Sequence, residues 1–105
     1  MLVTTSFDPT CRRLQAISLL FANNPNLLKF MFLPDRRGLS APPSELLEFA
    51  NGFSSGEKIL VQVALDLWSG EGHAQMGDVV ERLDLVRFEG FMLALECLRY
   101  GRVSI

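Results

Sequence analysis

The 105-residue sequence has few of the residues from which catalytic and metal sites are built, with one histidine and two cysteines. One cluster in the sequence has the residue types of such a site: Asp66, Glu71, His73 and Asp78. Their spacing lacks the alternating oxygen donors of a calcium loop and the closely spaced nitrogen or sulfur ligands of a zinc site. We therefore expect an exposed turn residue at His73, no metal or cofactor, and no enzymatic activity. The alternative of a small enzyme with an unmarked carboxylate site stays open.

The two cysteines, Cys11 and Cys97, lie far apart and belong to no CxxC pattern. So little cysteine is typical of a reduced compartment, and we expect a cytoplasmic protein. Cys11 lies near an expected helix N-terminus beside Arg12 and Arg13, and both features favour a thiolate. Because no base or resolving cysteine accompanies Cys11, we interpret it as a small apolar side chain.

The sequence also lacks an excess of positive charge, and it has no long apolar run. The chain has ten Lys and Arg against twelve Asp and Glu, which gives a net charge of −2. A nucleic-acid-binding protein usually carries a basic patch, and a helix needs about 20 apolar residues to cross a bilayer. We therefore expect no specific DNA or RNA binding and no membrane segment.

Helix signals recur along the whole chain, 1–105, and indicate a single α-helical domain. Asp8 and Asn24 each precede a proline, the pattern of a helix cap followed by the first helical residue. Segment 27–33 is strongly apolar and fits a helix or a buried strand, but the cap before it favours a helix. The sequence predicts an all-α compact bundle of five to six helices. The helices expected after the loop at 34–43 span 44–50, 55–69, 78–83 and 85–100.

Two of these helices are apolar around most of their circumference. The helix at 55–69, opened by a Ser-Ser-Gly-Glu capping box, has one narrow polar stripe, and the helix at 85–100 follows the same pattern. A helix of this kind normally lies at the centre of a fold. We therefore predict a core built on both helices, in which an Asp at Leu65 or Leu95 would unfold the protein.

The last three helices also have the order and lengths of a helix-turn-helix unit. A recognition helix directs Arg, Lys, Asn or Gln towards the bases. The polar stripe of the final helix instead carries Glu89 and Glu96 beside Arg99. A helix-turn-helix-like regulator that binds nucleic acid is therefore kept as the alternative function.

The abundance of apolar side chains favours a function in protein–protein contact. Hydrophobic residues make up 49% of the chain and include eight Phe, whereas so small a domain buries only about two-thirds of the surface its unfolded chain exposes. Exposed apolar patches usually mark interfaces, where aromatic residues are enriched. We predict a homo-oligomer or a small regulatory or adaptor subunit. Its candidate interface anchors are Phe30, Phe32, Trp68, Phe88 and Phe91.

Overall fold

The computed structural model describes residues 9–34 and 38–101, with side chains from residue 12 onward. The helices of this part are α1 (Pro9–Leu20), α2 (Pro25–Met31), α3 (Pro43–Ala50), α4 (Ser55–Ser69), α5 (Met76–Arg82) and α6 (Leu85–Tyr100). The predicted all-α bundle is therefore confirmed. Within the described residues no helix is long and apolar enough to cross a membrane.

The ambiguous segment 27–33 is helical as far as Met31 and extended from Phe32 (φ −117°, ψ 149°). Beyond α2 the chain folds back on itself, and Phe32 forms an isolated antiparallel bridge with Leu39. The amide of Ser40 donates a hydrogen bond to the carbonyl of Met31 at 2.7 Å. The favoured helix is thus confirmed for most of the segment, and the remainder belongs to the return towards α3.

Local capping explains where the two longest helices begin and end. At the start of α4, Ser54 Oγ accepts from the Glu57 amide at 3.3 Å and Glu57 Oε1 accepts from the Ser54 amide at 3.2 Å. These two bonds complete the predicted capping box. Asp84 caps α6 by accepting from the amide three residues along, at 2.8 Å. Gly70 and Gly101 end the two helices in the left-handed conformation, with φ values of 79° and 75°, which glycine adopts without a Cβ penalty.

Asn24 does not cap α2 in the expected way. Its side chain makes no capping bond; instead its Oδ1 accepts from Nε of Arg87 at 2.9 Å. The same guanidinium donates from Nη1 to Asp84 at 3.1 Å. Arg87 therefore ties the turn between α1 and α2 to the start of α6. The other expected cap, Asp8, and the side chain of Cys11 lie outside the described residues.

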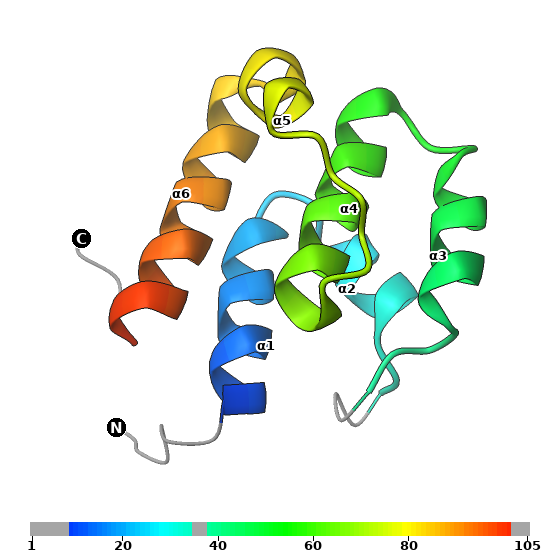
Figure 1. The fold of residues 1–105 in the computed structure, drawn as a ribbon, viewed down its shortest axis with the longest axis horizontal. Helices are drawn as coiled ribbons and strands as arrows, with labels where there is room; N and C mark the ends of the chain where they lie inside the picture. The colour runs from blue at the N-terminus through cyan, green and yellow to red at the C-terminus, as the bar shows by residue number, and fades with distance from the viewer. Residues whose placement is uncertain (1–8, 35–37, 102–105) are drawn as a thin grey trace.

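Helix α1 lies between α4 and α6 and packs against both of them (Figure 1). Gly90 allows α6 to come close, because a Cβ at this position would lie 3.1 Å from the carbonyl oxygen of Leu19. Helix α4 also packs on α2, α3 and α5. The last three helices therefore do not close on one another as a helix-turn-helix unit, since α6 packs mainly on α1.

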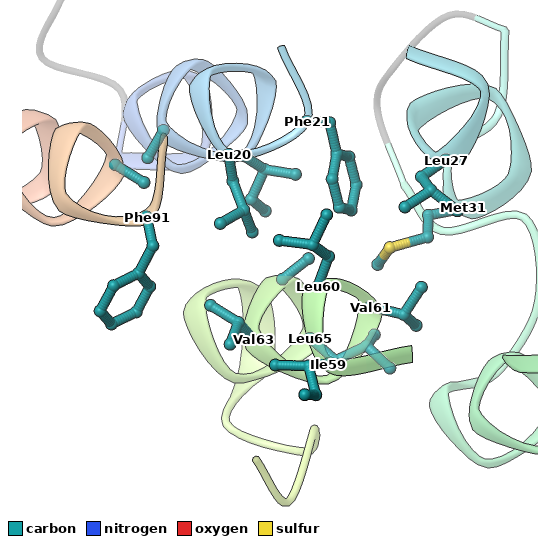
Figure 2. Packing of buried hydrophobic residues seen from close by; sticks show 14 of the residues in the cluster. Leu20, Phe21, Leu27, Met31, Ile59, Leu60, Val61, Val63, Leu65 and Phe91 are labelled. Carbon is teal, nitrogen blue, oxygen red and sulfur yellow. The ribbon is translucent and has the colours of Figure 1, made fainter. Parts of the chain in front are cut away.

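Helix α4 forms the centre of the hydrophobic core, and Figure 2 shows its side chains meeting those of α1 and α2. Leu60, Val61 and Leu65 have no exposed surface, so the predicted central position of this helix is confirmed. The prediction for α6 is wrong, because Leu95 is 38% exposed. Only one side of α6 is covered. The buried residues of α6 are Gly90, Phe91, Ala94 and Cys97.

Candidate functional site

The side of α6 that faces away from α1 is apolar and exposed. Leu85, Met92 and Leu95 are 71%, 50% and 38% exposed, and Phe88 is half-buried. These residues are spaced by three or four positions, so they lie in one stripe along the helix. Tyr100, which is 65% exposed, lies at the C-terminal end of α6 and lines the groove beside the stripe. These five residues are termed the outer face of α6.

The opposite side of α6 explains why the outer face is left open. Gly90, Ala94 and Cys97 are small residues that are buried on the side towards α1. Small side chains let two helices lie close together, and α1 packs closely on this side of α6. Helix α6 lies at the edge of the bundle in Figure 1. A helix at the edge of a bundle cannot turn all of its apolar residues inward, and the rest must face outward.

Side chains along the outer face enclose a shallow groove of about 710 Å³. Three charged residues, Glu89, Glu96 and Arg99, line the groove together with the apolar side chains. The guanidinium of Arg99 lies 5.9 Å from the centre of the Tyr100 ring, within the range of a cation–π interaction. The groove therefore combines apolar side chains with three charged groups.

The structure separates the five residues that were predicted as interface anchors. Phe32 and Phe91 are only 2% and 5% exposed. They are core residues, so the prediction that they anchor an interface is wrong for this fold. Trp68 is partly buried and meets the Phe32 ring edge-on, with 5.0 Å between ring centres. Phe30 is also partly buried and packs edge-on against two further phenylalanines. Of the five, Phe88 lines the groove on the outer face.

Sequence reasoning missed Met92, Leu95 and Tyr100, which contribute much of the exposed apolar surface of α6. The sequence of α6 nevertheless indicates which side of the helix is buried. Gly90 and Ala94 lie four residues apart and mark the side on which another helix can approach closely. The large apolar residues on the other side of α6 should then have been assigned to the surface.

The polar cluster around Asp66 has a structural role. The Asp66 carboxylate accepts backbone hydrogen bonds from Gly72 at 2.8 Å, His73 at 3.1 Å and Ala74 at 2.9 Å. These bonds hold the loop between α4 and α5 and support the left-handed conformation of His73 (φ 57°). His73 is exposed, as expected for a turn residue. In the described part of the chain, no group of three or more His, Cys, Asp or Glu residues could hold a metal ion.

Cys97 is a free thiol, 3% exposed, on the side of α6 that faces α1. Burial raises the pKa of this thiol, an effect partly opposed by the positive charge of Arg12. We expect iodoacetamide at about pH 8 to modify Cys97 at least ~10-fold more slowly in the native protein than in urea, because the buried, protonated thiol is a poor nucleophile. Peptide mapping by mass spectrometry distinguishes Cys97 from Cys11. Equal rates in the two states would contradict the burial of Cys97.

The raised pKa of Cys97 also predicts that the protein loses stability at alkaline pH. The unfolded chain loses this proton at a lower pH than the folded protein does. Ionisation therefore favours the unfolded state once the pH exceeds the ordinary thiol pKa, and stability falls as pH rises further. Urea unfolding of the wild type and of a Cys97→Ala variant at neutral and alkaline pH measures this contribution as a difference.

Comparison of the chain with known proteins found no matching family model, no matching curated protein and no matching solved structure. The function must therefore be inferred from the residues and geometry of the chain itself.

Proposed function

We propose that this protein acts by binding another protein chain through the outer face of α6, as a homo-oligomer or as a small regulatory or adaptor subunit. The observation that supports this function is the stripe of exposed Leu85, Met92 and Leu95 and half-buried Phe88, beside a groove of about 710 Å³ that the last three of the four residues line. Large apolar side chains gathered on one face gain free energy when a partner removes them from water, at about 25 cal/mol per Å². The charged side chains of Glu89, Glu96 and Arg99, which line the same groove, would add selectivity for a partner of complementary charge.

Nucleic acid is not the partner we propose. The groove contains two glutamates and one arginine, and phosphates are repelled by such an acidic margin. Two other arginines near α6 are already engaged: Arg87 bonds to Asn24 and Asp84, and Arg82 forms an ion pair with Asp78 at 3.4 Å. We infer that a helix-turn-helix-like regulator is a weaker explanation of this surface than a protein interface.

Replacing Met92 with Lys tests the proposed interface. Met92 is 50% exposed, so the variant should fold normally while placing a charge in the middle of the outer face. We expect association with the partner to weaken at least ~10-fold, the effect of losing a central apolar contact. Size-exclusion chromatography with light scattering over a dilution series measures self-association. Quantitative capture from the source cells measures binding of a different protein.

Phe49→Lys is the matched control. Phe49 is 67% exposed on α3 and, like Met92, has glutamates near it on its own helix. This variant should bind as the wild type does. If both variants bind equally well, or if the wild type associates with nothing at any concentration, the proposed function is wrong.

A further inference from the structure

We draw no further inference here: the strongest candidate, the outer face of α6, is an exposed apolar surface patch whose groove is lined by charges of both signs, and nothing in the structure shows what covers it.

Discussion

Replacing Leu65 with Asp is expected to unfold the protein at room temperature. Leu65 has no exposed surface and lies at the centre of the core around α4 (Figure 2). Loss of a buried leucine side chain alone costs about 2–5 kcal/mol, and an unpaired carboxylate in an apolar core costs several kcal/mol more. A domain of this size has a total stability of about 5–15 kcal/mol. Far-ultraviolet circular dichroism should show no cooperative melt for this variant.

Leu95→Asp is the matched comparison on the other long helix. Leu95 is 38% exposed, so an aspartate there stays in contact with water. We expect a loss of about 1–2 kcal/mol, mostly from helix propensity and partial loss of apolar contact, together with weaker self-association. If Leu65→Asp melts cooperatively or Leu95→Asp is unfolded, the core has been assigned to the wrong side of these helices.

Replacing Gly72 with Ala is expected to destabilise the protein by about 2–4 kcal/mol. Gly72 is buried against α4, and a Cβ at this position would overlap the carbonyl oxygen of Gln62 and lie 2.8 Å from the amide nitrogen of Asp66. These are backbone atoms of a central helix, so they cannot move aside, and the loop would have to shift. That shift would break the three hydrogen bonds that the Asp66 carboxylate accepts from the loop. Urea unfolding with a fluorescence readout measures the loss.

Gly77→Ala serves as the control for this prediction. Gly77 lies in α5, and an added Cβ would meet nothing within 4 Å. Alanine should therefore stabilise the protein by up to about 1 kcal/mol, because it favours the helix and restricts the unfolded chain. Equal effects of the two substitutions would show that the loop is free to move away from α4.

The difference between the two long helices shows what the hydrophobic pattern could predict. Both α4 and α6 are apolar around most of their circumference, and both begin and end at the capping residues expected from the sequence. Other helices pack on several sides of α4, whereas α6 has one principal partner, α1. A pattern within one helix reports that its surface is apolar. It does not report how many partners are present to cover that surface.

The Arg87 contacts show a second limit. Asn24 has the sequence position of a helix cap, and nothing within its own segment indicates another role. In the folded protein its side chain bonds to Arg87, 63 positions away in the sequence. A bond between segments so far apart depends on the packing of α1 against α6, which no local pattern contains.

Helix identity, the ends of α4 and α6 and the central place of α4 follow from the sequence, because caps, glycines and apolar periodicity act over a few neighbouring residues; α5 instead spans Met76–Arg82, two residues earlier at its start than the expected 78–83. Three features depend on tertiary structure: the side of α6 that is buried, the loop held by Asp66, and the location of the outer face. Each is set by the approach of segments that are distant along the chain. The surface available to a partner is the apolar surface that remains after the helices have packed, so it emerges only when α1 has covered one side of α6 and left Met92 and Leu95 exposed.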